Sequence, residues 1–236
     1  LLVNRSLPQD YSRHSIENNL ALLELLGAKQ RLPQPGYEIF LTPAEHAWAE
    51  GFLAEKKLSG RLLLGVHVGS GGTKNLARRR WPLAHYIEVI QKLIRARPEV
   101  AVLLFGGPEE EQDIRRVLAE GNSGHVFHPQ TKDLRQAAAL VKRCAAFLSV
   151  DTALMHIAAA MKVPGQVVIE TPTWNKTIEP YGNPFTLVRN PAVAGRGLEY
   201  YRYDGRGIRG TDEELARCMA SVTVEAVFEA VARTLE

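Results

Sequence analysis

The stretch FLSVDTALMHIAAAMKVP, residues 147–164, starts as an apolar strand pattern and continues as a helix of small residues. Asp151, Thr152 and His156 stand at or just after the turn between the two. The first N–H groups of a helix are unpaired and carry partial positive charge, so such a turn suits a phosphate or pyrophosphate. In the alternative reading, Asp151 only caps the helix and His156 is a partly buried core residue. This segment alone leaves both readings open.

The same alternation of strand and helix continues on both sides of this stretch. Apolar strands are predicted at residues 61–69, 100–107, 125–130, 145–150 and 165–170, and helices at 82–97, 108–121, 131–144, 152–162 and 221–235. Apolar strands that alternate with helices indicate a parallel sheet covered on both faces. We therefore expect an α/β, Rossmann-like, doubly wound domain of about five strands. Ligands of such sheets bind beyond the carboxyl ends of the strands.

The residues before the first strand have a helical pattern. Apolar residues recur with the helical period over 15–26, and Gly27 is a natural stop. Thr42, Pro43 and Glu45 form the capping pattern of a second helix. We expect a helical lead-in up to about residue 60. Because the first residue is not Met, we also expect the sequence to be a fragment of a longer chain.

The composition is that of an ordinary globular protein. The 236 residues are 45% hydrophobic and carry a net charge of only +3, so they do not indicate binding to nucleic acid or membrane. Cys144 and Cys218 lie far apart, which predicts neither a disulfide framework nor a zinc site and favours a reducing compartment. The seven histidines lack HxxxH or HExxH spacing, so no metal site is expected.

Two other segments follow predicted strands and suit a nucleotide. GSGGTKNLARRRWP (69–82) combines glycines, which admit close backbone approach, with cations for phosphate oxygens. It matches neither the P-loop pattern nor GxGxxG, and it could be only a solvated loop. Trp81 is expected to pack rather than to bind a ligand. In GGPEEE (106–111) a carboxylate could bind ribose hydroxyls, or the acidic residues could only complement a helix dipole.

Taken together, these segments resemble glycosyltransferase family nine, the ADP-heptose:lipopolysaccharide heptosyltransferases. The resemblance rests on GVHVGSGGTKNLARRRWP, LLFGGPEEE, TKDLRQAAALVKRC, SVDTALMHIAAAMKVP, PYG and CMASVTVEAVFEAV, and it covers nearly the whole chain. It implies the GT-B architecture of two Rossmann-like domains across a cleft. Residues 1–60 would then be the tail of the N-terminal acceptor domain and a linker, and residues 61–236 the C-terminal domain that binds the nucleotide sugar.

The resemblance implies roles for the loop after the first strand. Gly69, Ser70 and Thr73 would line the donor diphosphate. Arg79 would take the place of the family's lysine that neutralises the phosphates. An arginine offers a bidentate fork where lysine offers a point charge, so this is a departure from the family pattern.

It also implies how the nucleoside would be held. Glu110, or alternatively Glu111, would bind the ribose hydroxyls, and Lys132 and Leu134 would border the adenine. All four follow the second or third predicted strand.

The pyrophosphate and sugar would be held by Asp151, Thr152, Ala153 and His156. The family usually has Asp-Thr-Gly where this chain has Asp-Thr-Ala. The added methyl group is tolerable unless the residue needs a positive φ. The family's general base, an aspartate near the N-terminus of its members, has no counterpart here, so the catalytic base is unknown.

The implied function is metal-independent transfer of a sugar, heptose in this family, from an ADP-sugar to an acceptor hydroxyl of lipopolysaccharide or a related bacterial glycan. No cofactor and no nucleic acid are expected. The partners would be the nucleotide sugar and a glycan or glycolipid acceptor, met in the cytoplasm or at the cytoplasmic face of the inner membrane. The alternative is a nucleotide-sugar binding module without transfer activity. A nucleotide-sugar epimerase ranks lower, because GxGxxG and a Tyr-xxx-Lys pair are absent.

Overall fold

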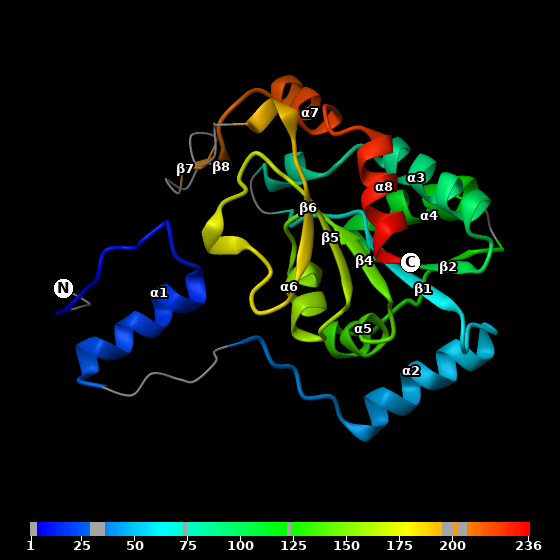
Figure 1. Ribbon diagram of the computed structural model, residues 1–236, viewed down its shortest axis with the longest axis horizontal. Helices are drawn as coiled ribbons and strands as arrows, with labels where there is room; N and C mark the ends of the chain where they lie inside the picture. The colour runs from blue at the N-terminus through cyan, green and yellow to red at the C-terminus, as the bar shows by residue number, and fades with distance from the viewer. Residues whose placement is uncertain (1–3, 29–35, 73–74, 122–123, 195–200, 203–206) are drawn as a thin grey trace.

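The core of the protein is a parallel β-sheet. The computed structural model describes residues 4–28, 36–72, 75–121, 124–194, 201–202 and 207–236. In these residues six strands run in the order β3-β2-β1-β4-β5-β6, and every neighbouring pair is parallel (Figure 1). The strands are β1 (Leu62–His67), β2 (Val100–Phe105), β3 (Val126–Phe127), β4 (Ala146–Ser149), β5 (Gly165–Ile169) and β6 (Phe185–Val188). The predicted doubly wound parallel sheet is confirmed.

The sheet has one strand more than the sequence predicted. β6 lies at the edge beside β5, and of its four residues only Val188 is buried. A short edge strand with one face toward solvent lacks the continuous apolar run that marked the other strands. The search for continuous apolar runs therefore did not identify β6.

Helices cover both faces of the sheet. They are α3 (Leu83–Ala96), α4 (Glu111–Glu120), α5 (Leu134–Val141), α6 (Ala153–Ala160), α7 (Asp212–Ala220) and α8 (Val224–Thr234), with α2 (Pro43–Glu55) from the lead-in. One core holds residues of α3, α4 and α8 with Leu104 and Leu148 of the sheet. The other holds residues of α2, α5 and α6 with Phe105 and Phe147. Neighbouring residues of one strand thus enter opposite cores, as the pleat requires.

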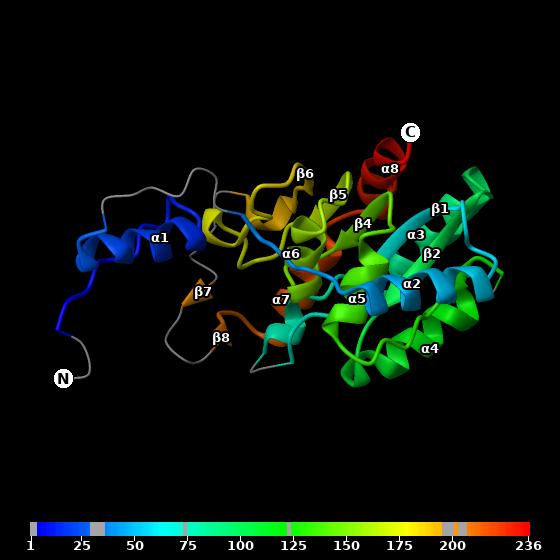
Figure 2. The ribbon, with the colours of Figure 1, turned by 90° about the horizontal axis from the view of Figure 1, so that it is seen from below.

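The lead-in begins with a helix that projects from the sheet. α1 (Ser15–Ala21) continues as a 3₁₀ helix, η1 (Leu22–Leu26), and Gly27 ends it with φ 76°. The side chains of His14 and Glu17 cap α1 reciprocally. Figures 1 and 2 both show α1 standing clear of the helices that cover the sheet.

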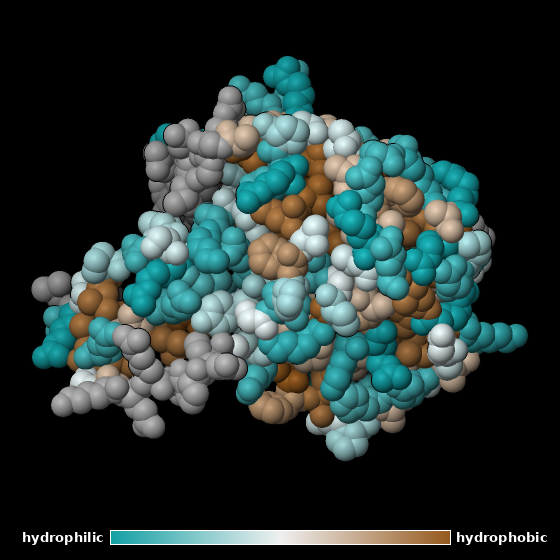
Figure 3. All heavy atoms as spheres, in the orientation of Figure 1, coloured by the Kyte–Doolittle hydropathy of each residue, from teal (hydrophilic) through white to brown (hydrophobic). Residues whose placement is uncertain are grey.

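The start of α1 nevertheless contacts the loop that follows β5. The Ser15 hydroxyl donates to the Thr177 carbonyl oxygen at 2.8 Å, and the His14 ring lies 4.5 Å from the Tyr181 ring. The outer part of the segment is hydrophobic and exposed: Leu26 is 82% accessible, and Figure 3 shows hydrophobic spheres on this lobe. The lead-in is thus attached to the sheet domain mainly through its first helical turn and through α2.

α2 starts as the sequence predicted. Its N-cap is Thr42, with Pro43 at the first helical position and a reciprocal bond from Glu45. Ala49 and Leu53 of this helix are buried in the core that contains α5. α2 therefore packs on the sheet domain.

The remaining elements are short. They are the 3₁₀ helices η2 (Leu76–Arg79), η3 (Pro108–Glu110), η4 (Lys176–Ile178) and η5 (Pro191–Val193), and the antiparallel pair β7 (Tyr201–Arg202) and β8 (Gly207–Ile208). The predicted terminal helix is α8, and α7 before it was not predicted. No helix in the described part of the chain is both long and apolar enough to cross a membrane.

Candidate functional site

The strand order reverses between β1 and β4, so the carboxyl ends of these two strands form the switch point of the sheet. From β1 the chain runs on to α3 on one face, and from β4 to α6 on the other face. Ligands of doubly wound sheets bind at such a switch point. β1 and β4 are in register with Val66 opposite Leu148, so their ends are side by side. The loops that carry most of the expected donor residues therefore meet here.

The corner between β4 and α6 is compact and polar. Asp151 and Thr152 are only 8% and 7% exposed. Thr152 is the N-cap of α6, and its hydroxyl accepts from the Met155 N–H at 3.3 Å. Ala153 is the first helical residue and is exposed, so its backbone is right-handed and its methyl group points outward. The departure from Asp-Thr-Gly therefore causes no backbone strain.

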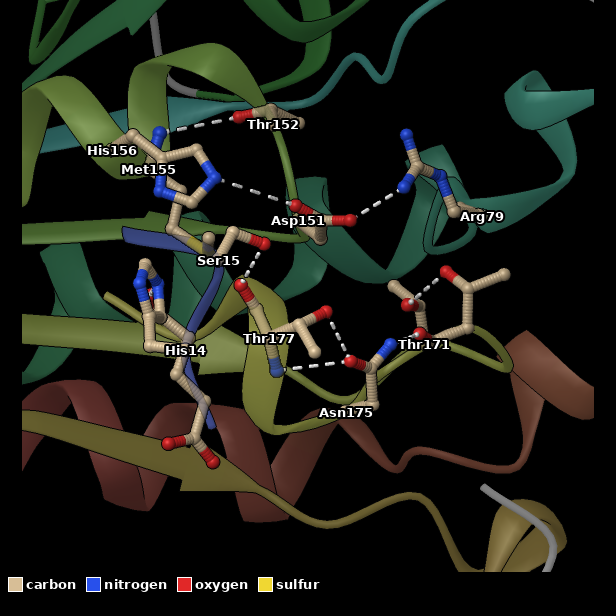
Figure 4. Close-up of polar contacts among 12 residues, drawn as sticks. His14, Ser15, Arg79, Asp151, Thr152, Met155, His156, Thr171, Asn175 and Thr177 are labelled. Carbon is tan, nitrogen blue, oxygen red and sulfur yellow. Dashed lines mark hydrogen bonds and ion pairs between the residues drawn. The ribbon is translucent and has the colours of Figure 1, made fainter. Parts of the chain in front are cut away.

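The loop after β1 reaches this corner through Arg79. Its Nη1 donates to Asp151 Oδ2 at 2.5 Å, and the two side chains are only 13% and 11% exposed (Figure 4). Arg79 Nε is buried and has no hydrogen-bond partner in the described part of the protein. One donor of the guanidinium is therefore still unsatisfied beside the helix N-terminus.

His67, at the end of β1, contacts the same corner. Its Nδ1 lies 3.2 Å from Thr152 Oγ1. Burial, assisted by the charge of Arg80, lowers the pKa of His67 to about 4, so the ring is neutral at pH 7. A neutral ring with its proton on Nε2 can accept a hydrogen bond from the Thr152 hydroxyl at Nδ1, which leaves the Thr152 oxygen oriented to accept from the Met155 N–H.

Glu110, the expected ribose residue, is held inside the site. Its side chain is 9% exposed, Oε1 accepts from Arg80 Nη2 at 2.8 Å, and Oε2 accepts from the Gly107 N–H at 3.0 Å. A Cβ on Gly69 would lie 2.4 Å from Glu110 Oε1, so the glycine permits the contact between the two loops. Glu111, the alternative, forms an exposed ion pair with Arg115.

Two other residues of the β1 loop, Ser70 and Trp81, are buried. Ser70 is 2% exposed, and its hydroxyl donates to the Leu76 carbonyl oxygen at 3.0 Å, which braces the loop internally. Thr73 lies outside the described residues. Trp81 is 1% exposed and packs in the core, as expected.

The expected adenine residues lie away from the centre of the site. Lys132 and Leu134 are exposed at the start of α5, and Leu134 is 59% accessible. Asp133 between them is the N-cap of α5. β3, which precedes this turn, is the edge strand, and β2 separates it from β1. These two side chains would therefore have to contact the outer end of an extended ligand.

His156 stands one turn into α6. Its Nε2 lies 3.9 Å from Asp151 Oδ1, and its ring is 5.3 Å from that of Tyr37 in the lead-in. Burial lowers the pKa of His156, although the Asp151 carboxylate opposes this shift. The ring is therefore mainly neutral at pH 7, and its buried Nδ1 has no partner among the described residues.

A pocket of about 340 Å³ opens beside the Arg79–Asp151 pair. The lead-in, the β1 loop, the turn between β4 and α6 and the loop after β5 supply its walls, which are Gln9, Tyr11, Ser15, Leu76, Arg79, Asp151, Thr173, Asn175, Thr177 and Ile178. The volume lies at the lower end of the range for small-molecule sites. Figure 4 shows Ser15, Asn175 and Thr177 on the side of Asp151 away from Thr152.

Sequence reasoning missed several of these residues. His67 was considered only as a metal ligand, although its place as the last residue of a predicted strand put it at the binding edge. Arg80 was not separated from the other arginines of its run. The lead-in residues of the pocket gave no signal, because only the fold brings them to the loop after β5.

The described residues contain no group of three or more His, Cys, Asp or Glu side chains placed to hold a metal ion. The two arginines of the site are instead each paired with carboxylates: Arg79 with Asp151, and Arg80 with Glu110 and Asp113. An anion at this site would therefore exchange with a carboxylate that is already there.

Comparison with known proteins agrees with the fold. The family model described as "Glycosyltransferase family 9 (heptosyltransferase)" matches residues 1–199. The chain therefore belongs to glycosyltransferase family 9.

Individual relatives are distant. Lipooligosaccharide heptosyltransferase 2 of Haemophilus influenzae is 28% identical over 159 residues, which are 66% of this chain and 44% of that protein. The structure of E. coli ADP-heptose lps heptosyltransferase II matches 98% of this chain and 64% of its own, at 23% identity and TM-score 0.69. The family 9 glycosyl transferase of Veillonella parvula matches 98% and 62%, at 20% identity and TM-score 0.75. The structures support the fold, and the chain spans less than two thirds of the length of these relatives.

Proposed function

We propose that this chain binds an ADP-sugar and takes part in transferring the sugar, a heptose, to an acceptor hydroxyl of lipopolysaccharide or a related bacterial glycan. Membership of family 9 supports this, as do relatives whose names specify heptosyltransferases and, for the E. coli structure, ADP-heptose. In this proposal residues 61–236 are the nucleotide-sugar-binding domain. Residues 1–60 are the tail of the acceptor domain and a linker, with α2 of that linker docked on α5.

The observation that carries the proposal is the Arg79–Asp151 pair. It joins the β1 loop to the N-terminus of α6 at the switch point of the sheet, where the two sides of a nucleotide-binding crevice meet. A guanidinium with an unsatisfied N–H beside a helix N-terminus is a suitable seat for a diphosphate. The Asp151 carboxylate occupies the position that a phosphate oxygen would take.

The chemistry follows from the charge on the leaving group. Breaking the glycosidic bond leaves a nucleoside diphosphate, so negative charge grows on the pyrophosphate in the transition state. Arg79 and the first N–H groups of α6 would stabilise that growing charge more than the charge of the bound substrate, which is what catalysis requires. Since these groups supply the positive charge, the proposed transfer needs neither a metal ion nor a cofactor.

When a diphosphate replaces Asp151 as the partner of Arg79, the Asp151 carboxylate becomes free to accept other hydrogen bonds. It would then face the pocket that also contains Thr173 and Asn175, where hydroxyl and amide groups suit a sugar. Gly69, Ser70, Thr73, Thr152, Ala153 and His156 complete the proposed donor seat.

The nucleoside would extend from the switch point toward β3. Each carboxylate oxygen of Glu110 can accept a second hydrogen bond, so ribose hydroxyls can bind although Arg80 and Gly107 already do. Lys132 and the exposed Leu134 would then contact the adenine. The acceptor is proposed to be a glycan or glycolipid, met in the cytoplasm or at the inner-membrane face. No residue of this chain is assigned as the base.

The test is calorimetric titration of the chain with ADP, UDP and GDP. We expect ADP to bind at least about tenfold more tightly than the other two, and an ADP-sugar to compete with it. Absence of ADP binding would reject the proposal. Binding of ADP-heptose without transfer to a lipopolysaccharide acceptor would favour the alternative of a binding module.

A further inference from the structure

Arg79 depends on a short element for its position. It is the last residue of η2, a 3₁₀ helix of four residues in which no side chain is buried. A helix of this length has little stability of its own. Contacts from outside η2 must therefore fix the guanidinium opposite Asp151.

Asn75, which directly precedes η2, supplies such a contact. Its side chain does not cap the helix that follows it. Instead, Nδ2 donates to the Ile208 carbonyl oxygen at 2.8 Å, and Oδ1 accepts from the Ile208 N–H at 2.8 Å. The side-chain amide thus pairs with one residue of β8 as a neighbouring strand would. The two residues are 133 positions apart in the sequence.

The β8 side of this contact is specific as well. Gly207 has φ 97°, and a Cβ there would lie 2.1 Å from Asn75 Oδ1. Both the backbone conformation and the close approach therefore require glycine. Ile208 is only 4% exposed, so the anchor is itself buried.

A second connection runs in parallel. Arg78 pairs with Asp212, the first residue of α7, but both side chains are well exposed. Solvent-exposed ion pairs contribute little to the stability of a folded protein. The paired amide of Asn75 is therefore the stronger of the two links from η2 to this part of the chain.

We propose that Asn75 is a positioning residue: by pairing with Ile208 of β8, it holds η2 so that Arg79 meets the β-phosphate of the donor. This inference rests on the proposed function. It adds the segment of β8 to the site, although that segment would touch no part of the substrate.

The experiment compares ADP with AMP, which lacks the second phosphate, by calorimetric titration of the whole chain. The wild-type protein should bind ADP more tightly than AMP, and Arg79→Ala should remove most of that difference. Asn75→Ala should weaken ADP binding about tenfold, because η2 would then have to be ordered when ADP binds, and change AMP binding less than about twofold. Asn75→Ala combined with Arg79→Ala should bind ADP no more weakly than Arg79→Ala alone.

Gly207→Ala approaches the same contact from the other side and should give the same loss of the ADP preference. Its matched control is Gly60→Ala. Gly60 also has a positive φ, 79°, which an alanine would find unfavourable, but the added methyl group would have open space around it. The control should lower thermal stability and leave the ratio of ADP to AMP affinity unchanged. That ratio separates positioning of Arg79 from general loss of stability.

Two outcomes would overturn the inference while the proposed function stands. In the first, Asn75→Ala and Gly207→Ala keep the wild-type ratio of ADP to AMP affinity although Arg79→Ala loses it. In the second, the losses of ADP affinity in Asn75→Ala and Arg79→Ala add in the double variant. If the wild-type chain does not distinguish ADP from AMP, the assignment of Arg79 to the diphosphate fails, and this inference fails with it.

Discussion

The β4–α6 corner and the loop from β1 to α3 face each other across the site but are held in shape differently. In the corner, Thr152 caps its own helix within three residues, and Phe147 anchors the strand in the core. In the loop, most of the fixing contacts are distant in sequence: Asn75 to Ile208, Arg79 to Asp151, and Arg80 to Glu110. The helix cap of the corner therefore forms locally, although His67 and Arg79 also contact the corner, whereas the loop is fixed almost entirely by contacts of the finished fold.

This difference has a functional reading. The cap of the corner joins residues within one helical turn and involves no group that a ligand would replace. A loop held by ion pairs and hydrogen bonds can exchange one partner for another, as Arg79 must do if a diphosphate replaces Asp151. The following experiments test this contrast, from the largest expected effect to the smallest.

The largest effect is expected from the core under the corner. Phe147 is fully buried, so Phe147→Ala should lower the free energy of unfolding by about 3–5 kcal/mol, through lost burial and a cavity. The measurement is urea denaturation. Phe40→Ala is the control: Phe40 is 78% exposed, and its loss should change stability by less than about 0.5 kcal/mol. Equal effects would contradict the assignment of Phe147 to the core.

The next effect concerns pH. The pKa of His67 is about 4 in the folded protein because the ring is buried, against about 6.5 when unfolded. As the pH falls from about 6.5 toward 4, the unfolded chain binds a proton that the folded chain does not. His67 should therefore cost up to about 3 kcal/mol of stability across this window.

His67→Asn should remove that share of the pH dependence. The measurement is urea denaturation of the wild-type protein and of His67→Asn at pH 7.5 and pH 4.5. His14 and His156 contribute to the pH dependence of both proteins, so the difference between them reports His67. An identical pH dependence would show that His67 is protonated without penalty, contrary to its burial beside Thr152.

Arg79 tests the loop side directly. Arg79→Ala should weaken ADP binding by about 2 kcal/mol, because a charged hydrogen bond is lost and Asp151 remains as an unpaired anion facing the phosphates. Arg79→Lys keeps the charge and should lose less. Arg116→Ala, which removes an exposed arginine of α4, is the control and should have no effect. Unchanged ADP affinity in Arg79→Ala would make the loop purely structural.

The smallest effect is expected at the helix cap. Thr152→Ala should lower the free energy of unfolding by about 1 kcal/mol through loss of the cap of α6. Thr223 caps α8 with a bond of the same length, 3.3 Å, but is exposed. Thr152→Ala should therefore lower the free energy of unfolding more than Thr223→Ala does, because it also leaves the buried His67 Nδ1 without its hydrogen-bond partner. The reverse order in urea denaturation would mean that the bond to His67 contributes nothing.

The same contrast explains what the sequence could predict. The five strands β1 to β5 were predicted because their apolar runs and the helices between them are local signals. Asp151, Thr152 and His156 were placed correctly at one turn for the same reason. Arg79 was expected to act on phosphates alone, and its pairing with Asp151 was not foreseen, because a partner 72 residues away leaves no local trace.

Elements without a core-facing pattern were also missed. β6 is a half-exposed edge strand, and β8 consists of two residues that pair with β7 and with the side chain of Asn75. Ala153 is an instructive intermediate case. The sequence raised the question of whether an alanine fits there, and only the helical backbone of the structure answers it.

The strand order has a consequence for how the protein is made. β1, β2 and β3 are neighbours in the sheet and are synthesised one after another, but the neighbour of β1 on its other side is β4. Since domains assemble as synthesis proceeds from the N-terminus, an unfinished chain exposes the edge of β1 until about residue 150 has emerged. Asn75 must wait still longer, until Ile208 is available. The loop from β1 to α3 can therefore make all its contacts only after residue 208 has been synthesised.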